Sequence, residues 1–348
     1  MVTLKEIAKA AGISPSTVSR VLSYDPTLSV ADATRTAVFE IAEALNYASP
    51  RTRAMRRAGT GKRLRIALAH FLRPEEELAD PYYVAVRLGI ERRCQALQAE
   101  IVRVYHTDDA PDASLLASAS GVIAVGPHTE QEISWLAKHN EALVFADSHP
   151  SGERFDCTFS DLASATTRLL DQLFSNGYKK FGIIAGFGLE DDKSAPKGDE
   201  RCRAFRAWAE RHQVFDPDYL HIGALRYETG YAAMQRWLGN SGIPQVIIGG
   251  NDNVAIGVYR AAQENGLKVG KDLAIVGFND IPAAQFLSPP LTTIHIEAEK
   301  LGEAAVDLLL ERLSGREMVK EVKLGVKIIW RESCRNTKLQ PHKKTGSK

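Results

Sequence analysis

The first 45 residues carry apolar side chains at helical spacing in three short groups, which indicates three short helices. The apolar positions are Leu4, Ile7, Ala8 and Ala11, then Val18, Val21 and Leu22, and then Val38, Ile41, Ala42 and Leu45. Gly12 ends the first helix, and Ser14 caps the second, whose first turn holds Pro15, where a missing N–H does no harm. The pattern predicts a small all-α unit in which a helix, a tight turn and a second helix occupy residues 4–22.

Beyond residue 63 short apolar runs alternate with amphipathic stretches. These apolar runs are residues 64–71, 121–125, 142–146, 180–185, 246–250 and 273–277. Runs of this kind separated by helical patterns are typical of βαβ units whose parallel strands are buried on both faces. Because the number of such runs over residues 64–332 exceeds one comfortable sheet, we expect an α/β domain with two Rossmann-like lobes.

The segment between these regions, residues 48–63, is basic, contains Pro and Gly and lacks apolar periodicity, as in a linker or hinge. The expected organisation is multidomain: a helix-turn-helix domain over residues 1–47, a hinge over 48–63, a two-lobed domain over 64–332 and a polar tail over 333–348. A chain of 348 residues is long enough for such a division.

The net charge of the whole chain is +1, but the charge is distributed unevenly along it. Residues 1–63 hold ten Lys and Arg against five Asp and Glu, a local charge of +5, which leaves −4 for the remainder. This asymmetry favours a polyanion as the partner of the N-terminal region.

The four cysteines, Cys94, Cys157, Cys202 and Cys334, are widely separated in sequence, without the spacing of an ordinary zinc motif or a disulfide scaffold. We therefore expect no metal and no cofactor. The N-terminus lacks the apolar core of a signal peptide, and the chain has no run of about 18 apolar residues. The expected location is the cytoplasm, away from the membrane.

The second predicted helix offers polar side chains that could contact DNA. In helix-turn-helix proteins the start of this helix lies in the major groove. Pro15, Ser16 and Arg20 could reach base edges, and Arg20 could donate two hydrogen bonds to a guanine. Hydroxyls of Thr3, Thr17 and Ser19 could bind phosphates. The candidate DNA contacts here are Thr3, Ser14, Pro15, Ser16, Thr17, Ser19 and Arg20. A small surface bundle whose Ser and Thr side chains only cap helices would show the same pattern, but the positive charge favours DNA.

Residues 4–22 closely resemble the N-terminus of the LacI/GalR repressor family, whose pattern is Leu-x-x-Ile-Ala-x-x-Ala-Gly-Val-Ser-x-x-Thr-Val-Ser-Arg-Val-Leu, followed later by Leu-Asn-Tyr, here residues 45–47. The resemblance implies that the hinge folds into a helix only on the operator, where a homodimer inserts an apolar wedge into the minor groove. Arg53, Ala54 and Met55 correspond best to this wedge, with Met55 in place of the usual Leu. The family's hinge spacing is blurred here, and a plain flexible tether is the alternative.

The resemblance continues to about Trp330 and implies a sensor with the architecture of periplasmic binding proteins. The motifs that carry it are Asp80-Pro81-Tyr82-Tyr83, Arg201-x-x-Ala204-Phe205, Asn251-Asp252-x-x-Ala255-Ile256-Gly257, Gly277-Phe278-Asn279-Asp280 and Pro289-Pro290-Leu291-Thr292-Thr293-Ile294. By family position, the candidate effector-binding residues are Phe71, Asp147, Arg201, Leu225, Asn251 and Asn279. Asp252 and Asp280 are interpreted as structural.

Several of these positions have simpler alternatives. Asn251 and Asn279 could close turns after strands, Asp147 could cap a helix, and Phe71 could belong to the core. Many relatives have an aromatic residue at the position of Leu225, so Tyr227 or Tyr231 could replace it, and the identity of the effector stays open.

The resemblance also implies three passages of the chain between the lobes, near residues 161, 292 and 321. The expected function is a non-enzymatic repressor that binds double-stranded operator DNA and is released by a sugar, with a β-galactoside as the favoured guess. The alternatives are a regulator that needs a purine or another metabolite as corepressor and, more distantly, a sugar-binding transport component. An enzyme is disfavoured because the chain contains neither Gly-x-Gly-x-x-Gly after a strand nor a P-loop sequence.

Overall fold

The computed structural model describes residues 3–22, 30–44, 64–105, 112–150, 152, 154–188, 197–239 and 242–334. The chain separates into two compact units, Met1–Arg63 and Leu64–Lys348. None of the helices in these described ranges is long and apolar enough to cross a lipid bilayer.

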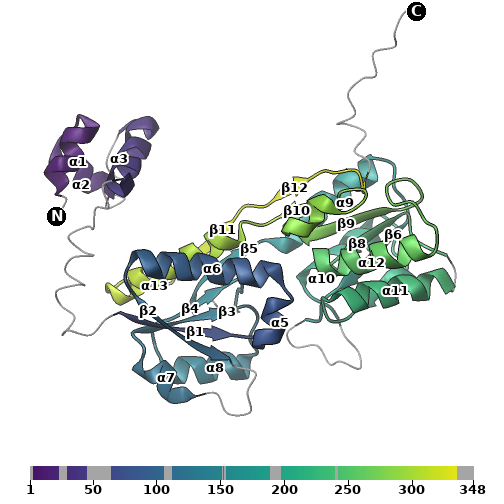
Figure 1. Cartoon of the computed structure of the whole chain (residues 1–348), viewed down its shortest axis with the longest axis horizontal. Coiled ribbons are helices and arrows are strands. Elements are labelled where there is room, and N and C mark those ends of the chain that lie inside the picture. Colours follow the sequence, from purple (N-terminus) through teal and green to yellow (C-terminus); the bar gives the residue numbers. More distant parts are fainter. Residues whose placement is uncertain are drawn as a thin grey trace, which may run out of the picture. The chain divides into compact units, whose positions relative to one another are not determined.

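In the described residues of the first unit, three helices (Figure 1) pack around a small core. They are α1 (Leu4–Ala11), α2 (Pro15–Leu22) and α3 (Asp32–Ala44). Ile7, Val18, Val21 and Val38 are fully buried between them, as the helical spacing predicts. Residues 23–29, between α2 and α3, and residue 45 lie outside the described part of the chain.

Local side-chain chemistry determines where α1 begins and ends. The Thr3 hydroxyl accepts a hydrogen bond from the Glu6 amide, and the Glu6 carboxylate accepts one from the Thr3 amide, which is a capping box. At the other end Gly12 has a φ of 67°, in the left-handed region that glycine adopts without strain. The turn into α2 therefore depends on this glycine.

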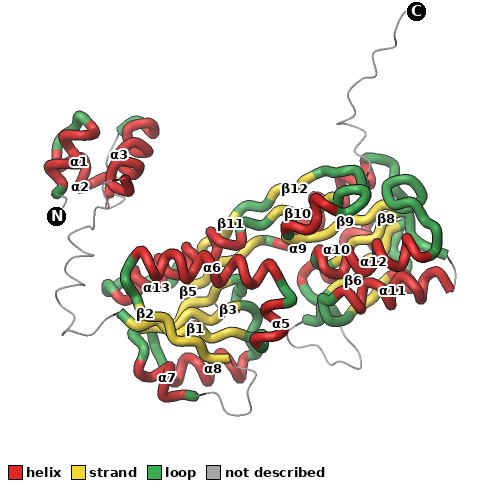
Figure 2. The backbone as a smooth tube through the Cα atoms, in the orientation of Figure 1, coloured by secondary structure: helices red, strands yellow, loops and turns green. Residues whose placement is uncertain are grey.

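The second unit contains two lobes, each built on a six-stranded sheet with helices on both faces (Figure 2). The sheet of lobe 1 is parallel throughout, in the order β11-β5-β4-β3-β1-β2. Its strands are β1 (Arg65–His70), β2 (Glu100–Tyr105), β3 (Gly121–Val125), β4 (Leu143–Ala146), β5 (Asp156–Ser160) and β11 (Glu321–Leu324). Its helices are α5 (Pro74–Leu78), α6 (Pro81–Ala96), α7 (Ala113–Ser118), α8 (Glu130–His139) and α13 (Ala298–Leu313).

Lobe 2 repeats this plan with the order β12-β10-β9-β8-β6-β7, in which only β12 is antiparallel to its neighbour. Its strands are β6 (Phe181–Ala185), β7 (Leu220–Ile222), β8 (Val246–Gly249), β9 (Ala274–Asn279), β10 (Thr292–His295) and β12 (Lys327–Ile329). Its helices are α9 (Leu162–Ser175), α10 (Glu200–Arg211), α11 (Tyr227–Gly239), α12 (Asp252–Glu264) and the 3-10 helices Pro217–Tyr219 and Pro282–Phe286. The expected two-lobed α/β domain is confirmed.

Alternate residues of each central strand enter different cores. In β6, Ile183 packs in the cluster that contains Trp208 of α10, whereas Ile184 packs with Val258 of α12. Successive side chains of a strand point to opposite faces, so a strand covered on both faces must be apolar at nearly every position. This is the reason why β6 and its central neighbours could be predicted as continuous apolar runs.

The chain passes between the two sheets three times. It leaves lobe 1 at Asp161, after β5, and returns through Ile296 and Glu297, after β10. The last passage is at Gly325 and Val326, between β11 and β12. The second and third passages correct the predicted positions near 292 and 321, because those residues begin strands that still pair within their own sheets.

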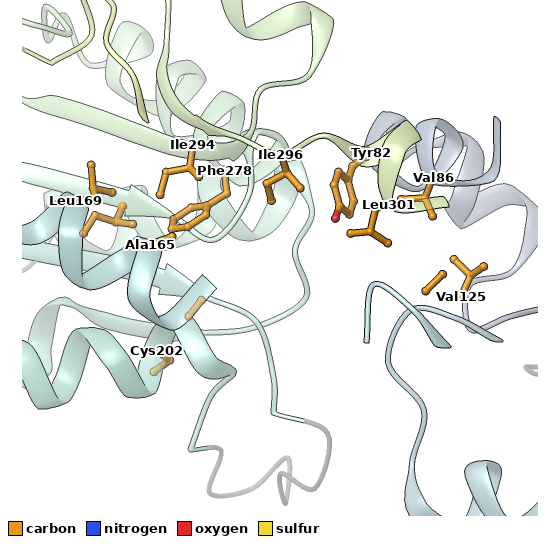
Figure 3. Packing of buried hydrophobic residues seen from close by; sticks show 14 of the residues in the cluster. Tyr82, Val86, Val125, Ala165, Leu169, Cys202, Phe278, Ile294, Ile296 and Leu301 are labelled. Carbon is orange, nitrogen blue, oxygen red and sulfur yellow. The ribbon is translucent and has the colours of Figure 1, made fainter. Parts of the chain in front are cut away.

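A buried apolar cluster continues from one lobe into the other at the second passage (Figure 3). Ile296 lies between Phe278 and Ile294 of lobe 2 and Tyr82 and Leu301 of lobe 1. The connecting segment is therefore packed on both sides, and the two lobes share part of their core.

Candidate functional site

The polar side of α2 is open to solvent. Ser14, Pro15, Ser16, Ser19 and Arg20 are exposed, and Thr17 is half-buried. The opposite side of the helix carries the fully buried Val18 and Val21. This arrangement leaves a row of hydroxyls and one guanidinium on a face that the small core does not use.

The hydroxyls at the start of α2 form a local cluster. The Ser14 Oγ accepts a hydrogen bond from the Thr17 amide at 3.0 Å, and it lies 2.7 Å from the Ser16 Oγ and 2.8 Å from the Thr17 Oγ1. Ser14 caps this helix, as Thr3 caps α1. Both hydroxyls thus cap a helix in addition to being expected DNA contacts. The start of α2 presents N–H groups and hydroxyls of the kind that bind phosphate at helix N-termini. Arg53, Ala54, Met55 and the Leu-Asn-Tyr sequence at 45–47 lie outside the described residues.

A cavity of about 1400 Å³ lies between the two lobes. Its walls come largely from segments that follow the carboxyl ends of strands, where open α/β sheets bind ligands. The six residues predicted from the sequence, Phe71, Asp147, Arg201, Leu225, Asn251 and Asn279, all line it. The fold thus gathers into one cavity residues that are dispersed over more than 200 positions of the chain.

Arg201, in the first turn of α10, is held in place from two sides. Its Nε and Nη2 donate to the Asp199 carboxylate at 3.0 and 2.6 Å, and its Nη1 donates to the Gly250 carbonyl at 2.5 Å. Asp199 also accepts hydrogen bonds from the amides of Gly186 and Cys202. Three of the five N–H donors of a guanidinium are engaged in this way, and two more can serve a ligand.

Asp147 follows β4 with a φ of 58°, a left-handed conformation that turns its side chain toward lobe 1's first helices. Its Oδ1 accepts a hydrogen bond from the Tyr82 hydroxyl at 2.7 Å. Burial raises the pKa of Asp147 to about 6, although the hydroxyls of Tyr82 and Tyr83 and the charge of Arg201 oppose this increase. The carboxylate is a half-buried hydrogen-bond acceptor in the cavity wall.

The two asparagines differ in the freedom of their side chains. The Asn251 Oδ1 accepts from the Val254 amide at 2.9 Å, and its Nδ2 donates to the Leu225 carbonyl at 3.1 Å. Asn251 therefore caps α12 and fixes the neighbouring loop, so its structural alternative accounts for both side-chain atoms. Asn279 ends β9 with a φ of 101° and lines the cavity.

The two aspartates interpreted as structural are engaged in lobe 2. Asp252 is fully buried and accepts hydrogen bonds from the Ile281 amide at 2.8 Å and the Thr293 hydroxyl at 2.7 Å. Asp280 pairs with Arg331 at 2.8 Å and with His295 at 3.1 Å.

Leu225 packs against glycine backbone, because a Cβ at Gly250 would approach its Cδ2 to 2.6 Å. Of the two tyrosines that could replace an aromatic residue at this position, Tyr227 lines the cavity. The Tyr231 hydroxyl instead donates to Glu264 at 2.7 Å, and Tyr231 is absent from the described cavity walls. Near Phe71, His70 is buried behind the wall, and burial lowers its pKa to about 4.

Among the cavity residues that sequence reasoning missed are two nearly buried polar ones, Asn253 of α12 and Ser160 of β5. Their side chains are 4% and 5% exposed, and no described residue hydrogen-bonds to the Asn253 Oδ1 or the Ser160 Oγ. The Asn253 Nδ2 donates to the Ala79 carbonyl of lobe 1 at 3.2 Å, across the gap between lobes. Asn253 lies two positions after Asn251 in the same motif, and that proximity was the available signal.

A second bridge between the lobes closes the side of the cavity near α5. Arg226, just before α11, forms an ion pair with Glu76 of α5. Glu77, a buried residue of the same helix, pairs with Arg87 of α6. The acidic run in this helix thus contributes one carboxylate to the bridge and one to the attachment of the helix.

The described walls of the cavity carry nine carboxylates against five Lys or Arg side chains. Six Phe and Tyr side chains also line it. The cavity is thus acidic, rich in hydrogen-bonding groups and provided with aromatic surfaces.

Comparison with known proteins shows similarity over nearly the whole length of the chain. Residues 3–49 match the family model "Bacterial regulatory proteins, lacI family", and residues 170–334 match a periplasmic binding protein-like domain. The transcriptional repressor MelR of Bacillus subtilis is 35% identical over 344 residues, which cover 96% of this chain and 98% of MelR.

A further relative and a solved structure similar to this chain are both lactose repressors by name. The lactose operon repressor of Rhizobium radiobacter is 53% identical over 108 residues, covering 31% of this chain and 96% of that sequence. The structure of the lac repressor dimer bound to operator and the anti-inducer ONPF superposes with a TM-score of 0.68 at 25% identity, over 95% of this chain and 98% of that one.

Proposed function

Because this chain belongs to the LacI family of bacterial regulatory proteins, we propose that it represses transcription as a homodimer on operator DNA, and that a small neutral sugar releases it. The first candidate for this sugar is a β-galactoside. The observation that carries the proposal is the meeting of Asp147 of lobe 1 and Arg201 of lobe 2 in one cavity. We place this activity in the cytoplasm, where the chromosome is accessible.

The geometry of α2 supports the assignment of the DNA contacts. Ser16 and Arg20 are four residues apart on the exposed side of the helix, so both can face the same groove. In this assignment Pro15, Ser16 and Arg20 contact bases. Thr3, Ser14, Thr17 and Ser19 contact phosphates, and Arg53, Ala54 and Met55 enter the minor groove. A dimer would read two half-sites of a pseudo-palindrome.

The chemistry of the cavity supports a sugar as effector. The Arg201 fork can donate to two hydroxyl oxygens, and the Asp147 carboxylate can accept hydroxyl protons. Asn279, and the unused acceptors of Asn253 and Ser160, add groups that a polyhydroxylated ligand can satisfy. Phe71 and Tyr227 provide apolar surface for the faces of sugar rings, while Leu225 contributes to the same wall.

Two resemblances favour a β-galactoside among neutral sugars. The first is to the relative named lactose operon repressor. The second is to the repressor of the evolved β-galactosidase operon. That repressor shares the turn Asp25-Pro26-Thr27-Leu28, the acidic run before Asp80 and the sequence Asn279-Asp280-Ile281-Pro282.

Release would follow from the two-lobed architecture. A sugar that bridges Asp147 and Arg201 stabilises one arrangement of the lobes, and the operator-bound dimer requires another. Because coupling between sites is reciprocal, operator DNA should weaken sugar binding by the factor by which the sugar weakens operator binding.

The test is footprinting of DNA upstream of the chain's own and neighbouring genes, with and without lactose and other galactosides. We expect a protected pseudo-palindrome that is lost when the effective sugar is added. Arg201→Ala should retain the footprint but lose the response, because the guanidinium that contacts the sugar is removed. Arg260→Ala is the matched control, since Arg260 pairs with Glu264 on an exposed part of α12.

Other outcomes would change the proposal. A footprint that appears only when the small molecule is present would establish the corepressor alternative. A footprint without any response to sugars, together with a response to purines, would reject a sugar effector. The absence of protection under all conditions would contradict the function as a whole.

A further inference from the structure

His149, Cys157 and Glu321 form a cluster at the edge of the lobe 1 sheet that the repressor function leaves unused. One potential ligand atom from each residue lies within 4.8 Å of those of the other two. These residues supply an imidazole nitrogen, a thiol sulfur and a carboxylate oxygen. The cluster therefore combines the three side-chain types that most often bind zinc in proteins.

The backbone determines the position of two of the three side chains. Cys157 of β5 is the direct partner of Glu321 in the parallel pairing of β5 with β11. Cross-strand partners place their side chains on the same face of a sheet, about 5 Å apart at the Cβ atoms. Because Cys157 packs with the residues under α7 and α8, Glu321 must start on that same face.

His149 comes to the cluster from the loop that follows β4. Its ring packs on Phe159 of β5, with 4.5 Å between the ring centroids. Its Nε2 lies 3.1 Å from the Glu321 Oε1. Imidazole and carboxylate thus already meet at the exposed margin of the sheet, directly beside the strand pair that carries the thiol.

We propose that His149, Cys157 and Glu321 bind a divalent transition-metal ion, with zinc as the first candidate and water as the fourth ligand. Bonds of about 2.0 to 2.3 Å around a tetrahedral ion separate its ligand atoms by about 3.5 Å, so any separation near the 4.8 Å limit must shorten by about 1 Å. The half-exposed His149 and Glu321 side chains, at 48% and 34%, can make that movement and admit the ion. Magnesium and calcium are disfavoured because they prefer oxygen ligands only.

The position of this site gives an ion a structural consequence. The loop of His149 also carries Asp147 of the effector cavity, and Glu321 begins the strand that precedes the third passage between the lobes. An ion would therefore join a cavity wall to a connecting segment. Binding replaces the thiol proton by the metal, releases that proton to solvent and stabilises the folded state.

Cobalt(II) provides a direct test, because a cobalt–thiolate bond produces a charge-transfer absorption that oxygen and nitrogen ligands do not. Titration of the reduced full-length chain should develop this band with saturation at one equivalent, and zinc should abolish it. Cys157→Ser should lack the band. Cys94→Ser is the matched control, a fully buried cysteine of the same lobe, and should retain it.

His149→Ala guards against a folding defect in the buried serine variant, since His149 is half-exposed. It should keep the thiolate band but bind cobalt at least about tenfold more weakly, because loss of a direct ligand should cost no less than loss of an outer-shell partner. The proposal is overturned if the wild-type chain develops no thiolate band, or if Cys157→Ser and His149→Ala bind cobalt as the wild type does. Circular dichroism of each variant verifies its fold.

Discussion

In the proposed effector site, the Arg201 guanidinium is already held in one orientation without a ligand. Asp199 neutralises its charge, and together with the Gly250 carbonyl it fixes the plane of the guanidinium. A donor that is already oriented loses less conformational entropy on binding. Asp199, two positions before Arg201 in the sequence, thus serves to orient the arginine.

Substitution of Arg20 tests whether α2 recognises the base sequence of the operator or contributes only electrostatic attraction to any DNA. Arg20→Ala should cost about 1 to 3 kcal/mol of preference for the operator over random DNA, because a bidentate contact to guanine is lost. Binding to random DNA, measured by fluorescence anisotropy at several salt concentrations, should weaken much less. Arg20→Lys keeps the charge without the fork and should lose the preference as well. Equal losses on both DNAs would contradict a base contact.

Asp147 should make stability depend on pH in a direction opposite to that of most carboxylates. Burial raises its pKa from 3.8 to about 6, so Asp147 stays protonated to a higher pH in the folded state than in the unfolded state. Its stabilising contribution is complete below about pH 4 and is lost as the pH rises through 6. Asp147→Asn should therefore melt at a higher temperature than the wild type at pH 7.5, and the difference should shrink toward pH 4.

The control for this measurement is Glu75→Gln, an exposed carboxylate in the wall of the same cavity. It should change the melting temperature little at either pH. A gain for Asp147→Asn that stays the same from pH 7.5 to 4 would show that the carboxylate does not titrate as proposed.

At the scale of elements, each lobe packs two helices through a pair of glycines. In lobe 1, a Cβ at Gly89 of α6 or Gly302 of α13 would lie 2.0 or 2.1 Å from a carbonyl oxygen of the other helix. In lobe 2, Gly230 of α11 and Gly257 of α12 would meet carbonyls at 2.0 and 1.9 Å. The absence of side chains at these four positions sets the distance between the helices.

Gly257→Ala should therefore destabilise the sensor, by about 1 to 3 kcal/mol, because the helices must separate to admit a methyl group. Gly239→Ala, at the end of α11, is the matched control, since none of the described residues outside its own helix backbone approaches its Cβ position within 4 Å. It should be neutral or slightly stabilising. Urea denaturation gives both values, and similar midpoints for the two variants would contradict the close helix packing.

The strands at the edges of the sheets show why some elements escaped prediction. The strand β11 has the sequence Glu-Val-Lys-Leu, and only its alternate residues are half-buried. Central strands such as β3 are apolar at every position because both faces are covered. Edge strands β2, β7, β11 and β12 lack this signal, and their pairing depends on partners elsewhere in the chain.

At the scale of the whole molecule, the acidic cavity selects against anions. The described walls carry nine carboxylates against five Lys or Arg side chains, and the resulting negative potential repels a phosphate group. We expect a galactose phosphate to bind at least about tenfold more weakly than the corresponding neutral sugar, since the phosphate carries a charge of about −1.5 to −2 at pH 7 and each unit-charge contact is worth about 1 kcal/mol at 4 Å in water. Calorimetry with both ligands measures the difference, which added salt should reduce. Equal or tighter binding of the phosphate would contradict this.

The sequence alone determined the three N-terminal helices, the family, the two α/β lobes and six residues that the structure places in one cavity. These depend on local periodicity or on motifs of adjacent residues, and both can be read along one segment. Tertiary structure alone decided the placement of Asn253 and Ser160 in the cavity wall, the passages between the lobes and the meeting of Cys157 with Glu321. The physical reason is that strand pairing and burial are interactions between segments remote in sequence. The pattern of apolar and polar residues within one segment does not show which other segment it will contact.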